Sequence, residues 1–386
     1  MASRRHWHLA TLAAAAAFLV AGCGGGSGIT GAEDAPVAKR VVIFGDSLSD
    51  LGAYTPATSL AGNGTAPFFG GKFTTNTHSG YTAASNTSTA NTWGEWIAAR
   101  LGVSITPHEV GFGPQSVKCP AAATIGPNSC TGYAQGGSRV TDPRGIGNPN
   151  GTGLVGANPA PMTRPVVTQI SDHLARFTGF DSGDIVFVWA GNNDAFVQLT
   201  AAGQGLPPAT AIANMQTAAT ELANLVKTQI LAKGATRVAV LTLPDASNTP
   251  GFSGLPAANK ALLTQLSAEF NTRLVSDLAG TAARIIDARA LSAATYSGAA
   301  ALGLNATVTA CDPAKISAVT GGRVTDGSSL FCNATAGAAF NGVRTGVTAT
   351  SHLFADSVHP TTRGHQIFAD QVFPLLKTFG WIPNNL

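Results

Sequence analysis

Four short apolar segments constrain the fold of this chain more than any other feature. Each is rich in β-branched or aromatic residues and is followed closely by Gly, Pro or Asp, which is typical of strands buried on both faces of a parallel sheet. The segments are residues 41–44, 184–190, 237–242 and 284–286. Helical patterns occur at roughly 165–178, 211–233, 256–279 and 362–378. Strands that alternate with helices predict an α/β fold with a parallel sheet covered on both faces, and with ligands at the carboxyl ends of the strands.

Three long segments lack hydrophobic periodicity. They cover residues 52–90, 111–163 and 292–350, and we expect them on the side of the sheet that receives the substrate. The chain has no internal repeat and no linker between two cores, so residues 40–386 are predicted to form one domain.

The charge balance excludes one large class of functions. Of the 386 residues, 23 are Lys or Arg and 20 are Asp or Glu, which gives a formal net charge of +3. Basic residues are scattered, so the chain lacks the electrostatic surface of a nucleic-acid-binding protein. We therefore expect neither DNA nor RNA as a partner.

The N-terminus is predicted to carry an export signal. Arg4 and Arg5 precede an apolar stretch over residues 9–21, which is shorter than the roughly 20 residues needed to span a membrane. It leads into Val-Ala-Gly-Cys, which resembles the cleavage site of bacterial lipoproteins. We expect a signal peptide over residues 1–22, then a lipidated Cys23 and a flexible tether over residues 23–39. The resemblance to bacterial lipoproteins implies attachment to the outer membrane in a two-membrane host, since glycine follows the cysteine. The alternative is an ordinary signal peptide with an incidental cysteine.

Four further cysteines are Cys119, Cys130, Cys311 and Cys332, and in an exported protein they would form disulfides. Three pairings exist, and local pairing of the first two and of the last two is favoured because each pair brackets a segment rich in Gly, Pro and Asn. A zinc site is the competing interpretation, but no CxxC spacing or nearby histidine pair supports it. We predict two disulfides and no metal.

A nucleotide cofactor is not expected. Residues 151–156 match GxGxxG, but no predicted strand precedes them and no helix follows, as a dinucleotide site requires. The chain also lacks a GxSxG sequence, which argues against the α/β-hydrolase fold.

Two sites along the chain have the residues of a hydrolytic centre. Ser47 lies in Gly-Asp-Ser-Leu-Ser-Asp directly after the first predicted strand, where its hydroxyl would face the ligand crevice, although such a turn can also be a helix cap. Asp356 lies three residues before His359, a spacing that lets the carboxylate orient the imidazole and leaves the other ring nitrogen free as a base. Either site alone is ordinary.

Two further blocks complete a pattern in chain order, Gly-Tyr-Ala-Gln-Gly-Gly over residues 132–137 and Gly-Asn-Asn-Asp over residues 191–194. With them, the chain resembles the SGNH/GDSL hydrolase family. The resemblance implies a flavodoxin-like three-layer α/β/α fold with a five-stranded parallel sheet. It also implies a catalytic triad of Ser47, His359 and Asp356, an oxyanion hole formed by Ser47, Gly137 and Asn193, and no cofactor.

Lesser similarities point to the branch of this family that contains lipolytic lipoproteins, outer-membrane esterases and hemolysin-like phospholipases. Lys-Phe-Thr-Thr-Asn at residues 72–76, Trp-Gly-Glu-Trp at 93–96 and the segment 353–361 look like that branch's blocks. The chain departs from them at Gly132, where Asn is usual, and at Ala355, where Trp is usual. Those departures concern the choice of substrate.

The resemblance implies a serine esterase or lipase that acts on small-molecule or lipid carboxylic esters. Acyl transfer, phospholipid hydrolysis and a non-catalytic binding role are the alternatives, and the sequence leaves the oligomeric state open. Aromatic residues gather in and just after the first long segment, so we expect an apolar acyl or aryl group as their partner. They are Tyr54, Phe68, Phe69, Phe73, Tyr81, Trp93 and Trp96. The alternative is that Trp93 and Trp96 form the buried face of a helix.

Overall fold

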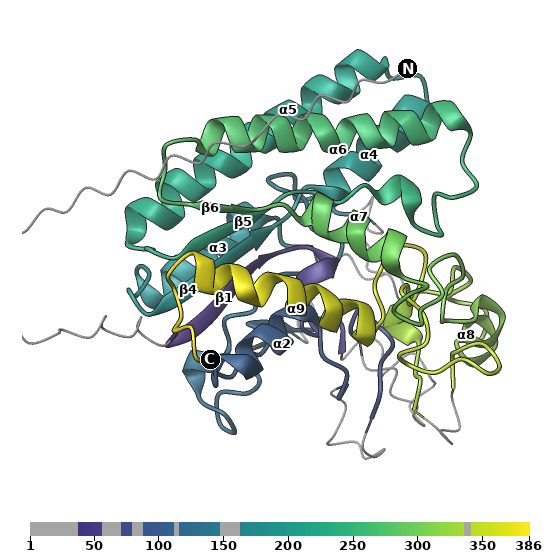
Figure 1. The fold of residues 1–386 in the computed structure, drawn as a ribbon, viewed down its shortest axis with the longest axis horizontal. Coiled ribbons are helices and arrows are strands. Elements are labelled where there is room, and N and C mark those ends of the chain that lie inside the picture. Colours follow the sequence, from purple (N-terminus) through teal and green to yellow (C-terminus); the bar gives the residue numbers. More distant parts are fainter. Residues whose placement is uncertain (1–37, 56–70, 79–87, 112–115, 147–162, 336–340) are drawn as a thin grey trace, which may run out of the picture. The chain divides into compact units, whose positions relative to one another are not determined.

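A parallel sheet forms the centre of the protein (Figure 1). The computed structural model describes residues 38–55, 71–78, 88–111, 116–146, 163–335 and 341–386. In these residues the sheet has four parallel strands in the order β1-β4-β5-β6. The strands are β1 (Arg40–Gly45), β4 (Asp184–Trp189), β5 (Val238–Leu241) and β6 (Arg284–Ile286). Each matches its predicted apolar segment to within a residue, and the parallel α/β fold is confirmed.

The described sheet has four regular strands instead of the predicted five. Residues 131–135 occupy the fifth position, beside β1, but they pair with it irregularly. The N–H of Ile43 donates to the carbonyl of Thr131 (3.0 Å), and the N–H of Tyr133 donates to the carbonyl of Ile43 (2.8 Å). The segment runs alongside β1 and thereby brings residues 132–137, the block that contains Gly137, toward Ser47 at the end of the strand.

The side chains of β1 alternate between two apolar layers. Val42 and Phe44 pack in one layer, and Val41 and Ile43 pack in the other. The first layer includes α3 (Val166–Phe177), α5 (Pro208–Leu225) and α6 (Ala257–Leu278), and the second includes α2 (Trp93–Arg100) and α9 (Thr362–Thr378). Figure 1 shows α5 and α6 on one side of the sheet and α2 and α9 on the other. Burial on both faces explains why the strand is a continuous apolar run.

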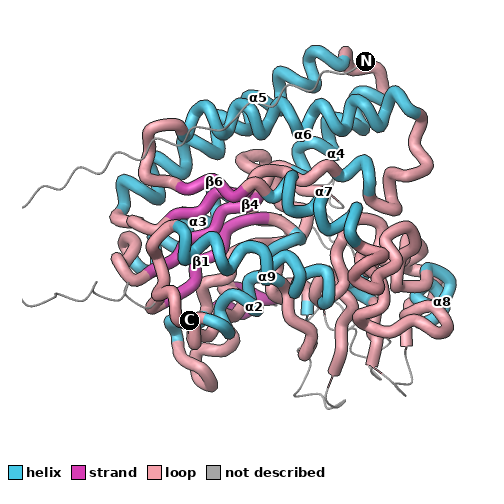
Figure 2. Tube along the Cα trace, in the orientation of Figure 1, coloured by secondary structure: helices cyan, strands magenta, loops and turns pink. Residues whose placement is uncertain are grey.

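Several elements depart from the predicted helices. The predicted helix over 211–233 begins at Pro208 as α5 and passes through a π-helix (Val226–Ile230) and a 3-10 turn (Leu231–Lys233) before it ends. The unpredicted elements are α4 (Asn192–Gly203), α7 (Ala288–Gly298), α8 (Pro313–Val319) and the antiparallel pair β2 (Glu109–Val110) and β3 (Val117–Lys118). Helix α8 and most of α7 lie in the segment 292–350, which therefore contains regular structure. Figure 2 shows that loops also gather beside these two helices.

Two disulfides cross-link segments within the loop regions of the chain. They join Cys119 to Cys130 and Cys311 to Cys332, which confirms the local pairing. The second lies in a small apolar cluster with Phe73, where segments from the two halves of the chain meet. Disulfides persist mainly in exported proteins. In the described residues, no helix is both long and apolar enough to cross a membrane.

Candidate active site

Ser47 lies just beyond the carboxyl end of β1, as the first residue of a 3-10 turn. Asp46 caps this turn. Its Oδ1 accepts the N–H of Leu48 (3.1 Å), and its Oδ2 accepts the side-chain amide of Asn192 (3.1 Å). The hydroxyl of half-buried Ser47 has no hydrogen-bond partner among the described residues, His359 included. As the first residue of a helical turn, Ser47 also presents an N–H that no helical carbonyl accepts.

Asp356 and His359 form a hydrogen-bonded pair. Nδ1 of His359 lies 2.8 Å from both carboxylate oxygens of Asp356. The same carboxylate accepts the backbone N–H groups of His359 (2.9 Å) and Ser329 (2.8 Å). Burial alone would raise the pKa of Asp356, but His359 and the hydrogen bonds outweigh it and hold that pKa well below its usual range. The ionised carboxylate places the ring hydrogen on Nδ1, which leaves Nε2 of a neutral imidazole as the proton acceptor.

One cavity is lined by Ser47, Asn193 and His359 together. Its apolar walls come from several elements and are formed by Leu48, Trp189, Phe196, Ala246, Ala293, Tyr296, Leu353, Phe354, Val358 and Phe368. Arg289 and Asp245 also line it and form an ion pair at 3.4 Å. A bound substrate group would therefore meet mostly hydrocarbon next to Ser47.

Gly137 is not among the described residues that line this cavity, although both of its neighbours are tied to the site. The N–H of Gly136 donates to Asp50 (2.9 Å), and the carbonyl of Ser138 accepts the side-chain amide of Asn193 (2.8 Å). Gly137 itself has a φ of 81°, and a side chain there would collide with the facing backbone, so the position requires glycine.

The N-terminus of α4 connects the two loops of the site. Asn192 bonds to Asp46, and Asn193 bonds to the loop after Gly137, which leaves one amide hydrogen of Asn193 uncommitted by that bond. Asp194 accepts Nε of Arg139 at 2.9 Å. Burial raises the pKa of Asp46 and of Asp194 to about 6 in each case, against the opposing hydrogen bonds and, for Asp194, the charge of Arg139.

Two residues that hold the site, Asp50 and Ser329, were not selected from the sequence. Asp50 accepts the N–H groups of Gly52 (2.8 Å), Ala53 (2.8 Å) and Gly136 (2.9 Å), and burial raises its pKa to about 6. Its position in the same block as Ser47 was the available signal. Ser329 contributes a backbone N–H, which any residue type other than proline offers, so no sequence signal marks it.

The aromatic residues expected to receive the substrate mostly lie elsewhere. Trp93 is buried in the core with its ring 5.2 Å from that of Phe187, and Trp96 packs at the edge of the same layer, as the alternative of a buried helix face predicts. Tyr54 packs edge-on against Phe73. Phe68, Phe69 and Tyr81 lie outside the described residues.

The aromatic residues that line the cavity come from other parts of the chain. They are Trp189, Phe196, Tyr296, Phe354 and Phe368. They are dispersed along the sequence, and only the ends of the strands and helices bring them together. An expectation based on local clustering could not select them.

Two remaining expectations concern a lipidated cysteine and the absence of a metal site. Cys23 lies outside the described residues. In the described ranges, no group of three or more His, Cys, Asp or Glu side chains is placed to hold a metal ion.

Comparison with known proteins identifies the family. The family model of the GDSL-like Lipase/Acylhydrolase matches residues 41–372, which is well over half of the chain. No curated protein matches the chain. The matched range contains Ser47, Gly137, Asn193, Asp356 and His359, and the family name describes hydrolases of ester substrates. The chain belongs to the GDSL-like lipase/acylhydrolase family.

Proposed function

We propose that the protein is a serine esterase that hydrolyses carboxylic esters through a covalent acyl-serine intermediate. The observation that carries this proposal is the cavity that Ser47 shares with His359, whose other ring nitrogen is bonded to Asp356. A neutral serine hydroxyl is a poor nucleophile and requires such a neighbouring base.

In the proposed reaction, Oγ of Ser47 attacks the ester carbonyl carbon while Nε2 of His359 takes the hydroxyl proton. The tetrahedral intermediate collapses, the bond to the alcohol oxygen breaks, and the leaving alcohol receives the proton from His359. Water then attacks the acyl-serine with His359 again as the base. Release of the carboxylic acid restores Ser47.

The negative charge of the tetrahedral intermediate would be met by hydrogen-bond donors. We assign this role to the N–H groups of Ser47 and Gly137 and to the side-chain amide of Asn193. The tie between Asn193 and the loop after Gly137 supports the assignment, because it holds two of the donors in one unit. Each such donor is typically worth about 10²–10³ in rate.

The cavity walls favour an apolar acyl or aryl group on the substrate. Together with the N-terminal sequence, they support a lipid or small aromatic ester as the substrate of an exported lipoprotein. In this proposal residues 1–22 are removed, Cys23 carries the lipid, and residues 23–39 tether the hydrolase domain over residues 40–386 to the outer membrane. Disulfides support the exported state.

The decisive experiment is hydrolysis of a chromogenic short-chain ester by the parent and by Ser47→Ala, followed by a panel of acyl lengths, aromatic esters and phospholipids. Ser47→Ala should abolish turnover and keep the fold. The matched control is Ser297→Ala, an exposed serine of α7 outside the cavity. A Ser47→Ala enzyme within about tenfold of the parent rate would contradict the nucleophile assignment. Ester binding without turnover by the parent would instead indicate a binding protein, and preferential transfer to an added alcohol would indicate an acyltransferase.

The anchor has its own experiment. Cys23→Ser should release the protein from the membrane fraction with unchanged specific activity, because a glycine-rich tether separates the cysteine from the hydrolase domain. Retention of this variant in the membrane pellet would contradict a lipid anchor at Cys23.

A further inference from the structure

We propose that Asn76 is a positioning residue that holds the loop supporting Asp356, and with it the orientation of His359. The inference rests on the proposed function, because that function assigns Asp356 and His359 to the proton relay. It assigns a role in catalysis to the turn over residues 72–76. In the described part of the chain, no residue of this turn lines the cavity.

Asn76 is fully buried and uses both ends of its side-chain amide. The two hydrogens of Nδ2 are shared among the carbonyl oxygens of Lys72 (3.0 Å), Thr74 (3.1 Å) and Ser329 (2.9 Å). Oδ1 accepts the N–H of Lys72 at 3.3 Å. The bonds to Lys72 and Thr74 fold residues 72–76 into a tight turn, and the bond to Ser329 ties this turn to a distant loop.

Ser329 links the turn to Asp356. Its carbonyl accepts the amide of Asn76, and its N–H donates to Oδ2 of Asp356 at 2.8 Å. Ser329 begins the 3-10 helix Ser329–Phe331, so its N–H has no acceptor within that helix and is available to the carboxylate. A second bond holds the same loop, from the N–H of Asn76 to the carbonyl of Cys332 (3.0 Å). The N–H of Ser329, one of the donors whose hydrogen bonds Asp356 accepts, is therefore placed by Asn76.

The same turn contacts the imidazole directly. The ring centroid of Phe73 lies 4.6 Å from that of His359. Phe73 is itself held by Tyr54, whose ring packs edge-on at 5.5 Å and whose hydroxyl donates to the carbonyl of Gly136 (2.7 Å). The turn thus acts on both members of the pair, through Phe73 at the imidazole and through Asn76 and Ser329 at the carboxylate.

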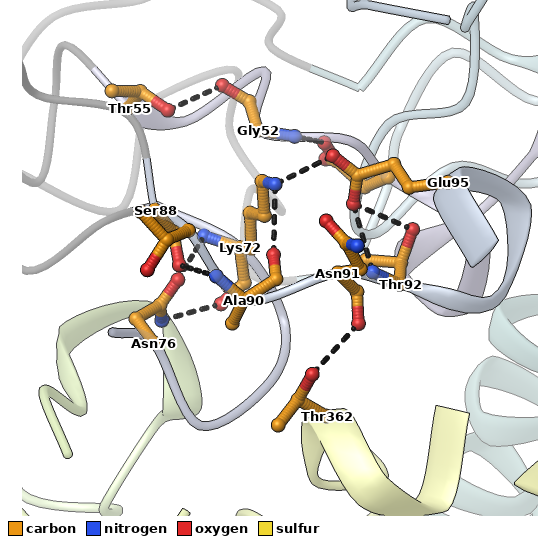
Figure 3. A network of polar contacts seen from close by, with 12 residues as sticks. Gly52, Thr55, Lys72, Asn76, Ser88, Ala90, Asn91, Thr92, Glu95 and Thr362 are labelled. Atoms are coloured by element: carbon orange, nitrogen blue, oxygen red, sulfur yellow. Dashed lines mark hydrogen bonds and ion pairs between the residues drawn. The ribbon is translucent and has the colours of Figure 1, made fainter. Parts of the chain in front are cut away.

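Lys72 anchors the other end of the turn, as Figure 3 shows. Its Nζ donates to Oε1 of Glu95 (2.6 Å) and to the carbonyl of Ala90 (2.9 Å). Glu95 lies in the first turn of α2 and accepts the N–H of Thr92 (2.8 Å). The Lys72 side chain is only 2% exposed, so water and salt screen this ion pair weakly. The turn is therefore fixed to α2 at one end and to the loop of Ser329 at the other.

The test compares Asn76→Ala with Asn271→Ala in the full chain. Asn271 is also buried and also uses both ends of its amide on backbone groups, with the N–H of Leu243 at 2.7 Å from Oδ1 and the carbonyl of Leu243 at 2.9 Å from Nδ2, but neither bond involves the loop of Ser329. We expect Asn76→Ala to lower kcat about 10- to 100-fold with KM within about twofold of the parent, as for loss of an outer residue that orients a catalytic group. The far-downfield proton NMR signal of the His359 Nδ1–H should weaken or shift. Asn271→Ala should keep both the parental kcat and the signal.

If Asn76→Ala fails to fold, Ser329→Pro tests the same link to Asp356. Proline lacks the N–H that Asp356 accepts, and it fits the first position of a helix after an extended residue, here Ser328 with ψ 129°. We expect the same fall in kcat and the same change in the NMR signal.

Parental kcat and an unchanged signal in the folded Asn76→Ala or Ser329→Pro enzyme would overturn the positioning role. Equal losses in Asn76→Ala and Asn271→Ala would also overturn it, since they would reduce Asn76 to a general stabilising residue. An Asp356→Asn enzyme as fast as the parent would instead overturn the proposed function, because the relay itself would be misassigned.

Discussion

Proton transfer from Ser47 in the proposed mechanism requires a neutral imidazole at His359. We therefore expect kcat/KM to rise with pH. The carboxyls of Asp46 and Asp194, whose pKa burial raises to about 6, ionise within the same range and contribute to this rise. Asp356 does not, because the effect of burial on its pKa is outweighed by His359 and the hydrogen bonds it accepts, which hold that pKa well below its usual value. Asp356→Asn should lower the rate steeply, since the imidazole hydrogen is no longer fixed on Nδ1. The measurement is a pH–rate profile on a soluble ester, and a flat profile between about pH 5 and pH 8 would contradict the relay.

Asn193 offers a second test on a single residue. If its amide serves the transition state, Asn193→Ala should lower kcat by roughly 10²-fold and leave KM nearly unchanged. Steady-state kinetics on the same ester separates the two parameters. An effect confined to KM would make Asn193 a substrate-binding residue.

The attachment of the 72–76 turn to α2 gives a prediction about one element. Lys72→Met leaves the Glu95 carboxylate without its cation and the Ala90 carbonyl without its donor, in a place where Lys72 is buried. We expect a loss of about 3–5 kcal/mol in the free energy of unfolding, measured by urea denaturation. The Lys72→Met/Glu95→Gln double variant should recover part of this loss, because the glutamine side chain carries no charge and its amide oxygen can still accept the N–H of Thr92. A double variant less stable than Lys72→Met would contradict the ion pair as the cause.

The elements predicted from the sequence are those with a strong local pattern. The four strands are buried on both faces, and α3, α6 and α9 differ from their predicted ranges by only one residue at each end or less. Helix α4 was not predicted because it begins with Asn-Asn-Asp only two residues after β4, and α8 has only seven residues. Tertiary packing, which no local window contains, fixes such helices.

The same distinction holds within the candidate site. Asp356 and His359 lie three residues apart, so their contact could be predicted from spacing alone. Asn76 reaches Ser329 across 253 residues through a backbone carbonyl, which every residue type offers. Contacts of that kind leave no signature in one sequence.

For the whole molecule, buried ionisable groups set how stability depends on pH. Burial lowers the pKa of five histidines, to about 4 for His108 and His173 and about 3 for His365, and also lowers it for His78 and His352. Unfolding frees these imidazoles to bind protons below about pH 6.5, so this contribution to stability is lost as the pH falls. The carboxyls of Asp46, Asp50 and Asp194 act in the opposite direction, because burial raises each pKa to about 6 and the folded state gains protons first.

The histidines outnumber these carboxyls, so we expect the melting temperature to be lower at about pH 4.5 than at about pH 7. Calorimetry at the two values, in buffers of equal ionic strength, measures this difference. A higher melting temperature at the acidic value would show that the three carboxyls dominate.

The Cys311–Cys332 disulfide makes the support of the proposed active site depend on oxidation. It closes the loop from which Ser329 reaches Asp356, and the carbonyl of Cys332 receives the N–H of Asn76. The support of the proposed relay is therefore completed by a covalent bond that an oxidising compartment makes and a reducing one does not. A chain still inside the cell would carry Ser47 and His359 without this closure. Under the proposed function, oxidation after export would then be a maturation step, so that ester hydrolysis would begin only in the exported protein.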